Sequence, residues 1–364
     1  MTNFLPTKAS TTETPWVSVP TIPIAEVSFD GAMILANRYA SHGDEIDPLL
    51  QAAQAVLPVL RGAKVIETAR DDNETVARVR TELGDDTNKP ILLWVAGGDN
   101  AYRCGARSAV GNGFVVAGVG LGNGNVAQKI TNSEKFHRHP EKLLEPGKGV
   151  IREQYLFEVF FNGEWHVAAT NAGFGETGVG AHKISHAMHR EHPLYKTRSF
   201  REMKEYLLAL QSIYEIKRAH RVVPILEDGE IGLVLGRDFM FGPEMAKVAD
   251  MPYTQLDDPE AIYFDMVNHT QLARWVYGVQ TGTLPYKRLS AGETHSIEVL
   301  NETYAYLDGD PHKMEPGIFR VRYLPDTYKA LTVTQQRTEV KRYHGVRGFV
   351  LGFRPVLTSM IARW

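Results

Sequence analysis

Two apolar runs in this sequence each end in a glycine-rich corner. Residues 91–96 are continuously apolar and lead into two glycines and an aspartate at 97–99. Residues 114–117 lead in the same way into the glycine-rich segment 118–125. Continuous apolar runs are typical of buried parallel strands, and ligands bind at the carboxyl ends of such strands. A corner without side chains lets an anion or a flat group approach the backbone. Two adjacent corners therefore predict one nucleotide cleft, with Asp99 as its first polar group.

The segments around these corners alternate between strand-like and helix-like patterns. Apolar residues at helical spacing predict helices at 49–60 and 71–83, and compact apolar runs predict strands at 33–36 and 64–68. The order strand, helix, strand, helix, strand opens a doubly wound sheet. The N-terminal part is therefore predicted to be a Rossmann-like α/β domain.

The later part of the chain has the short, punctuated pattern of antiparallel β structure. Residues 155–167 alternate around an asparagine–glycine pair at 162–163, which is a strong hairpin signal. A helix is predicted at 200–216. Further short strands are predicted at 221–226, 231–235, 261–266, 296–300, 304–307 and 319–323. Many short strands separated by turns indicate a mainly β-sandwich C-terminal domain.

Composition excludes several classes of protein. Lysine and arginine number 40 against 43 aspartates and glutamates, so no overall basic surface indicates a nucleic acid partner. A single cysteine, Cys104, excludes an intramolecular disulfide and a cysteine-based metal site. The sequence has no run of about 18 apolar residues, so no membrane span is predicted, and the N-terminus lacks the features of a signal peptide. We expect a cytoplasmic protein, and both a peripheral membrane contact and a homodimer stay open.

Both glycine corners resemble motifs of one kinase superfamily. Residues 95–100 are similar to the G-G-D-G-T motif of the diacylglycerol kinase, sphingosine kinase and bacterial lipid kinase superfamily, which is distantly related to NAD kinase. Residues 122–127 are similar to its G-T-x-N-D motif. The resemblance extends over about residues 33–332. The chain departs from these motifs at Asn100, Ala101, Asn123 and Val126.

The resemblance implies two domains, with the chain returning to the first domain at the end of the second. We expect a flexible leader at 1–31, a nucleotide-binding α/β domain at 32–145 and a β-sandwich acceptor domain at 146–332. Residues 333–364 form an apolar and basic tail beyond the resemblance. This tail would dock on the protein's own body or on a second subunit, or would lie at a membrane interface.

The same resemblance assigns roles to individual residues. Asp310, in a segment similar to the D-G-E motif, would be the general base that takes the proton of an acceptor hydroxyl. Asp257 and Asp258, in a segment similar to L-D-D-G, would hold Mg²⁺ through oxygen ligands. Without the resemblance, both acidic segments are ordinary turns. The residues implied to bind ATP are Asn37, Ser41, Thr68, Gly97, Gly98, Asp99, Asn100, Gly122, Asn123 and Asn125.

Four histidines stand close together in the sequence, at His182, His186, His189 and His192. Their offsets place the first three on one face of a helix. Zinc can bind histidines at such spacing. A solvated polar face, or a face that contacts a phosphate or a headgroup, is an equally simple interpretation.

The sequence thus predicts an ATP- and Mg²⁺-dependent kinase that phosphorylates a hydroxyl of a diacylglycerol-like or sphingoid-like lipid. It contains neither a Walker motif nor the protein-kinase motif set. Two alternatives remain. The motif departures fit a pseudokinase that binds nucleotide or lipid without turnover, and the same fold could act on a nucleoside, a sugar or NAD.

Overall fold

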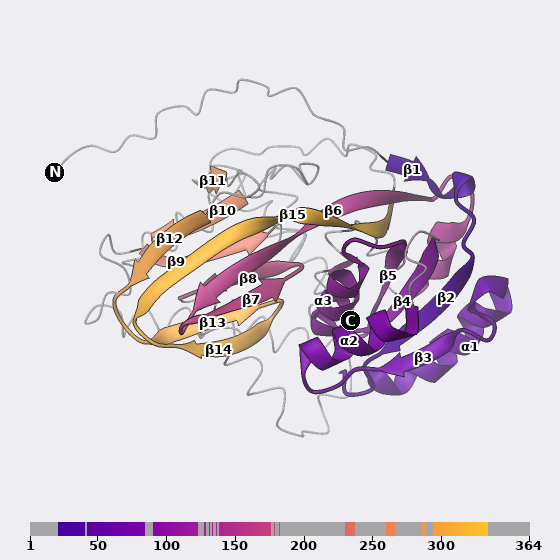
Figure 1. The fold of residues 1–364 in the computed structure, drawn as a ribbon, viewed down its shortest axis with the longest axis horizontal. Coiled ribbons are helices and arrows are strands. Elements are labelled where there is room, and N and C mark those ends of the chain that lie inside the picture. The colour runs from indigo at the N-terminus through magenta and orange to yellow at the C-terminus, as the bar shows by residue number, and fades with distance from the viewer. Residues whose placement is uncertain are drawn as a thin grey trace, which may run out of the picture.

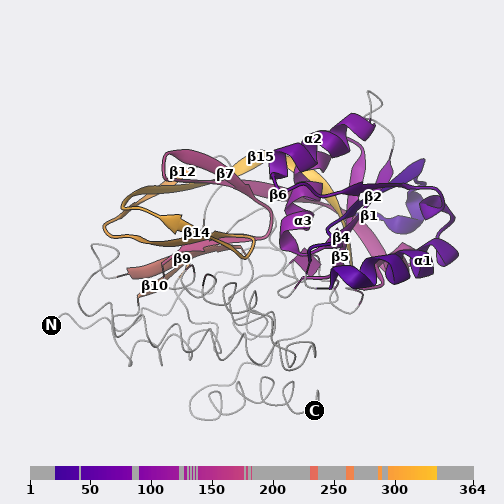
Figure 2. The ribbon, with the colours of Figure 1, turned by 90° about the horizontal axis from the view of Figure 1, so that it is seen from below.

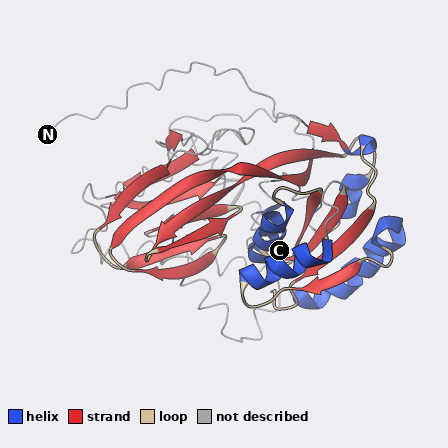
Figure 3. Ribbon diagram, viewed as in Figure 1, coloured by secondary structure: helices blue, strands red, loops and turns tan. Residues whose placement is uncertain are grey.

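The computed structural model describes residues 21–40, 42–83, 90–122, 127–128, 131, 133, 136, 138–175, 178, 182, 230–236, 260–265, 286–288 and 294–333. The predicted helix at 200–216, the predicted strand at 221–226 and residues 334–364 of the tail lie outside this set. The described residues form two adjoining parts. One part has helices on both faces of a sheet, and the other is built mainly from strands (Figures 1 and 3).

Four parallel strands form the sheet of the α/β part, in the order β3-β2-β4-β5. They are β2 (Gly31–Ala36), β3 (Lys64–Glu67), β4 (Ile91–Gly97) and β5 (Phe114–Gly120). The helices that follow the first three are α1 (Ile46–Val56), α2 (Asp72–Leu83) and α3 (Asp99–Ala109). The four predicted strands and the helix at 71–83 are confirmed. The predicted helix at 49–60 is wrong at its end, because Leu57 is extended and Pro58 starts a separate 3₁₀ turn, η3 (Pro58–Leu60).

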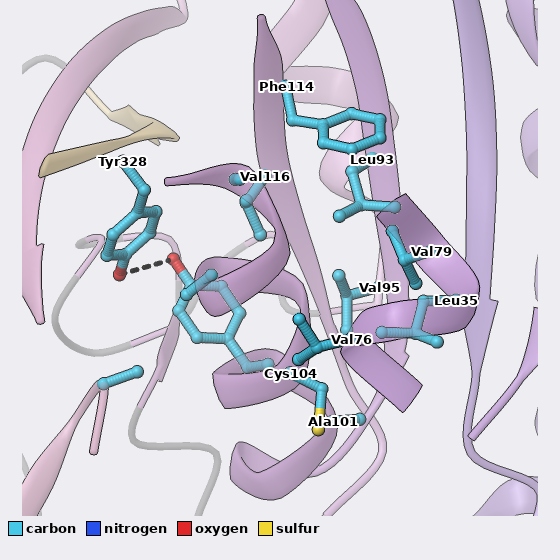
Figure 4. Packing of buried hydrophobic residues seen from close by; sticks show 14 of the residues in the cluster. Leu35, Val76, Val79, Leu93, Val95, Ala101, Cys104, Phe114, Val116 and Tyr328 are labelled. Carbon is cyan, nitrogen blue, oxygen red and sulfur yellow. Dashed lines mark hydrogen bonds between the residues drawn. The ribbon is translucent and has the colours of Figure 1, made fainter. Parts of the chain in front are cut away.

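Alternate residues of the central strands pack against different helices. Leu93 and Val95 of β4 belong to the cluster under α2 and α3, part of which is shown in Figure 4. Leu92 and Trp94 belong to the cluster on the opposite face, under α1 and η3. A strand covered on both faces needs apolar residues at every position, which explains the continuous run at 91–96.

Two long antiparallel strands join the α/β part to the β part (Figures 1 and 2). They are β6 (Gly149–Phe161) and β15 (Gly317–Val333). The end of β15 pairs in parallel with β5, while its start pairs with β12 (Thr294–Val299). Since β6 also pairs with β7 (Glu164–Ala168), one nine-stranded sheet runs through both parts. Its ladder is interrupted on β15 between Tyr323 and Thr327.

A second, antiparallel sheet completes the β part. Its strands, in order, are β11 (Tyr286–Arg288), β10 (Glu260–Asp265), β9 (Glu230–Gly236), β8 (Asn171–Phe174), β13 (Thr303–Leu307) and β14 (Asp310–Met314). Side chains of β8, β13 and β14 share an apolar core with side chains of β6, β7, β12 and β15. The structure is therefore a doubly wound α/β region joined to a β-sandwich, the fold class that the sequence predicts.

A buried polar contact lies where α3 meets the two long strands. The hydroxyl of Tyr328 on β15 donates to Gln154 Oε1 on β6, 2.6 Å away. The same hydroxyl lies 3.4 Å from that of Tyr102 on α3, the contact drawn as a dashed line in Figure 4. Helix α3, which begins at the first glycine corner, is thus linked to both strands that continue into the sandwich.

Two local expectations concern turns and ends of the chain. Asn162 and Gly163 have φ values of 51° and 84°, as a two-residue type I′ turn requires, so the hairpin between β6 and β7 is confirmed. Within the expected flexible leader, Thr21–Pro23 forms β1, which pairs with β6, and Ile24 is buried. The described part of the leader is therefore attached to the sheet.

None of the helices formed by the described residues is both long and apolar enough to span a bilayer.

Candidate active site

The two glycine corners predicted from the sequence are in contact. They follow β4 and β5, whose carboxyl ends are neighbours in the sheet. A Cβ placed on Gly98 would lie 3.3 Å from the Cα of Gly122. The N–H of Leu121 donates to the carbonyl oxygen of Gly97 at 2.8 Å. The backbones approach this closely because neither corner carries a side chain, so their adjacency is a direct consequence of the sequence.

The residues after β2 and β3 lie at the same edge of the sheet. The strand order reverses at β2 and β4, where open α/β sheets bind ligands. At this point the N–H of Asn37 donates to Ala96, and the N–H of Thr68 donates to Ala36. The Oδ1 of Asn37 accepts a hydrogen bond from the N–H of Tyr39 at 3.0 Å, so its carboxamide shapes the loop after β2.

Asp99 connects the two corners. It is the first residue of α3, and its Oδ1 accepts a hydrogen bond from the N–H of Ala127 at 2.9 Å. Ala127 follows the second glycine-rich segment in the sequence. The carboxylate that the sequence offers to a ligand therefore also anchors the chain beyond the second corner.

The carboxylates of the β13–β14 turn have two different environments. Asp308 and Gly309 have φ values of 50° and 88°, and they form the two-residue turn between β13 and β14. The side chain of Asp308 is fully buried. Its Oδ1 accepts hydrogen bonds from the N–H groups of Thr170 and Asn171 and from the Thr170 hydroxyl, at 2.7, 3.0 and 2.7 Å. Asp308 thus holds the turn against the chain that enters β8.

Arg103 of α3 bridges this turn to the α/β helices. Its Nη2 lies 2.7 Å from Asp72 Oδ2 at the start of α2, 2.6 Å from Asn100 Oδ1 and 3.6 Å from Asp310 Oδ2. Its Nη1 lies 3.3 Å from Asp308 Oδ2. Although burial alone would lower the pKa of this guanidinium, the surrounding carboxylates raise it, so Arg103 is charged.

Asp310 is the carboxylate that remains accessible. It begins β14, and 45% of its side-chain surface is exposed. Partial burial raises the pKa of Asp310 to about 6, and the neighbouring Arg103 opposes this rise. At neutral pH the group is therefore mostly ionised but close to its titration range, which suits a residue that takes up a proton.

Two histidines line the sandwich next to Asp310. His312 follows Asp310 by two residues on β14, and His166 belongs to β7 of the other sheet, with ring centroids 5.9 Å apart. Phe161 stacks on His166 at 4.4 Å. Burial lowers the pKa of His312 to about 4, so its imidazole is neutral at physiological pH.

Sequence reasoning missed Arg103, Asp308 and the His166–His312 pair. The signal for Arg103 appears only in the structure: it lies on α3 among residues that are nearly all buried, and a buried arginine requires a carboxylate partner. Nothing local in the sequence names that partner, because Asp308 is 205 residues away.

Several predicted site residues lie outside the described part of the chain. They are Ser41, Asn123, Asn125, Asp257 and Asp258, together with His186, His189 and His192. His182 is described, and its ring stacks on Tyr304 at 4.1 Å. Among the described residues, no cluster of three histidine, cysteine or acidic side chains could hold a metal ion by itself.

Comparison with solved structures identifies the fold around this site. A protein of Bacillus anthracis strain Sterne that is provisionally named a diacylglycerol kinase aligns with 84% of this chain and 98% of its own, with a TM-score of 0.52 and 12% sequence identity. The chain has the fold of this diacylglycerol kinase. A second structure under the same provisional name, also from Bacillus anthracis, gives a TM-score of 0.51 at 13% identity, over 84% of this chain and 98% of its own.

Other comparisons add little to this. Yeast NADH kinase complexed with NADH aligns over 92% of this chain and 94% of its own at 9% identity, but a TM-score of 0.40 is too low to support an inference. No family model matches the sequence. No curated protein matches it either.

Proposed function

We propose that this protein is an ATP-dependent kinase that phosphorylates a hydroxyl group of a lipid. The observation that carries the proposal is the position of Asp310 relative to the glycine corners. Asp310 and Asn100 both contact the same nitrogen of Arg103, and Asn100 lies in the first turn of α3, two residues after Gly98. A carboxylate of the sandwich therefore lies beside the helix whose N-terminus faces the two corners.

The phosphates of ATP would bind at the corners. Gly97, Gly98 and Gly122 offer backbone without side chains, and the N-terminus of α3 offers the positive end of a helix dipole. Asn37 and Thr68 would border the same edge. The Oδ1 of Asn100, which the resemblance assigns to nucleotide binding, accepts a hydrogen bond from Arg103, so Asn100 would contribute through its amide nitrogen.

Magnesium would act as a partner of the phosphates. Mg²⁺ usually keeps several waters and takes one or two carboxylates in addition to phosphate oxygens. Asp257 and Asp258 remain the proposed protein ligands. The ion would neutralise negative charge on the transferring phosphate.

Asp310 would act as the general base. The acceptor hydroxyl loses its proton to the Asp310 carboxylate while its oxygen forms a bond to the γ-phosphorus. The bond between that phosphorus and the β–γ bridging oxygen breaks, and ADP leaves with the bonding electrons. The products are the phosphorylated acceptor and ADP.

The lining of the sandwich supports an acceptor that is polar at one end. Every second residue of β14 faces the same side of the strand, which places Asp310, His312 and Met314 on one side. Met314 belongs to the buried apolar core of the sandwich. A neutral histidine between a carboxylate and an apolar interior suits an uncharged hydroxyl-bearing head followed by a hydrocarbon body. A diacylglycerol-like or sphingoid-like lipid has this form, whereas a nucleoside does not.

Transfer of labelled phosphate tests the proposal directly. The full chain is incubated with γ-labelled ATP, Mg²⁺ and a total lipid extract, and then with single acceptors: diacylglycerol, a sphingoid base, a nucleoside and NAD. Label in a lipid product is expected. Label only in the nucleoside or NAD would overturn the lipid assignment, and nucleotide binding without transfer to any acceptor would identify a pseudokinase.

Substitution of Gly98 is expected to weaken nucleotide binding selectively. The Gly98→Ala methyl group would lie 3.3 Å from the Gly122 backbone, in the gap where the phosphates are proposed to bind. We expect the Kd for ATP to rise about 10-fold or more, equivalent to about 1.4 kcal/mol. The negative φ of Gly98 suits alanine, but the 3.3 Å contact with the Gly122 backbone is tight, so we expect a small fall in Tm beside the larger loss of affinity. Calorimetric titration measures the Kd.

Gly31→Ala is the matched control for this variant. Gly31 is the first residue of β2, at the amino end of the strand and away from the glycine corners, and a Cβ there would meet nothing within 4 Å. Unchanged ATP affinity in Gly98→Ala, or an equal loss in Gly31→Ala, would contradict phosphate binding at the corners.

A further inference from the structure

Arg103 is the one described side chain that contacts α2, α3 and the β13–β14 turn together. Its Nε and Nη2 lie 2.9 and 2.7 Å from Asp72 Oδ2, and its Nη1 donates to the carbonyl oxygen of Leu307 at 3.2 Å. The same guanidinium holds Asp308 and faces Asp310. Only 6% of the residue's surface is exposed. A rigid, planar fork in such a place fixes the directions of all its partners.

The geometry points to Arg103 as a positioning residue that holds Asp310 against the first turn of α3 and keeps its carboxylate ionised for proton uptake. This inference rests on the proposed function, in which Asp310 is the base. At 3.6 Å the contact with Asp310 is longer than a hydrogen bond, so it orients the carboxylate while its oxygens can still accept the proton of the hydroxyl. The short bonds of Arg103 go to Asp72 and Asn100.

The charges around Asp310 act in opposite directions. Partial burial of Asp310 has the largest effect and favours its protonated form, whereas Arg103 of α3 favours the ionised form. Asp308 in the same turn and Asp72 of α2 add to the effect of burial. A single cation therefore opposes two anions and desolvation at the proposed base, and it offsets them only in part.

The same guanidinium connects the two halves of the proposed reaction. Asn100 is on the nucleotide side, and Asp310 is on the acceptor side. Because both contact Nη2 of Arg103, a change in the position of one is transmitted to the other through one rigid group. Asn100, which departs from the glycine of the resembling motif, thus has a defined partner in this chain.

Opposite shifts in the ionisation of Asp310 test the inference. An opposite charge within about 4–6 Å lowers a carboxylate pKa by roughly 1–3, so Arg103→Met should raise the pKa of Asp310 from about 6 to between about 7 and 9. Asp72→Asn removes a like charge and should lower the pKa of Asp310. The acid limb of the kcat/KM–pH profile should move in the same directions. A loss of packing alone would lower activity without moving this limb to opposite sides in the two variants.

Nuclear magnetic resonance of the Asp310 carboxyl carbon measures this pKa without any turnover. Arg107→Met is the matched control, because Arg107 lies one turn later on α3, hydrogen bonds Asn73 and approaches Asp72 only to 3.9 Å. Its Asp310 midpoint should match that of the wild type. If Arg103→Met does not fold, Asp72→Asn and Arg103→Lys, which keeps the charge, carry the test.

The outcomes separate this inference from the proposed function. A midpoint for Asp310 that is the same in the wild type, Arg103→Met and Asp72→Asn overturns the role of Arg103, even if the protein transfers phosphate. Shifts of opposite sign in a protein that transfers no phosphate leave the role of Arg103 in place and refute the kinase.

Discussion

The variant Asp310→Asn is expected to transfer phosphate about 10²–10⁴ times more slowly than the wild type, the usual contribution of a general base. Asparagine has almost the same shape as aspartate but cannot accept the proton of the hydroxyl. Because Asp310 is proposed to contact the acceptor hydroxyl and not the phosphates, the Kd for ATP should stay within about 3-fold of the wild-type value, a change of under 1 kcal/mol. Single-turnover transfer of labelled phosphate separates the chemical step from binding.

This loss should not arise from unfolding. The pKa of Asp310 is raised on folding from 3.8 to about 6, so the stabilising contribution of its protonated form is complete below pH 3.8 and is lost as pH rises through about 6. At pH 7 the wild type therefore gains nothing from this group that asparagine would remove. Asp326→Asn, which replaces an exposed carboxylate of β15, is the control and should keep full activity. Normal transfer by Asp310→Asn would eliminate Asp310 as the base.

The variant Asp308→Ala is expected to lose about 3–5 kcal/mol of unfolding free energy, since it breaks a buried ion pair and leaves its partners unpaired. The N–H groups of Ala169, Thr170 and Asn171 all donate to this carboxylate. The φ of 50° at this position adds a cost for alanine. Urea denaturation followed by circular dichroism measures the difference.

Asp308→Asn distinguishes the hydrogen bonds from the charge. Asparagine tolerates the left-handed backbone and retains one acceptor oxygen, so this variant should lose clearly less stability than Asp308→Ala. Asp326→Ala provides a surface reference and should change the unfolding free energy by under about 0.5 kcal/mol. Equal stability of Asp308→Ala and the wild type would mean that the turn is not held by this carboxylate.

The parts of the fold that local patterns determine could be predicted from the sequence. The continuous apolar run at 91–96 requires a strand covered on both faces, and the residue pair at 162–163 requires a tight hairpin turn. The contact between the glycine corners could also be expected, because parallel strands place their carboxyl ends at one edge. In each case the physical cause lies within a few residues.

The parts that depend on distant partners could not be predicted. The ion pair of Arg103 and Asp308 joins residues 205 positions apart, and the hydrogen bond between Ala127 and Asp99 crosses from one corner to the next. Asp308 itself was visible only as half of a turn signal. Its burial follows from the way in which β8 and β13 pair, which no periodicity reveals.

Strand β6 runs without a break through both parts of the molecule. Two domains joined by a flexible linker can rotate apart, but here such a rotation would break hydrogen bonds between paired strands. The pairing of β15 with β6 is interrupted between Tyr323 and Thr327. Because the two parts share this sheet, we expect them to unfold together in one cooperative transition.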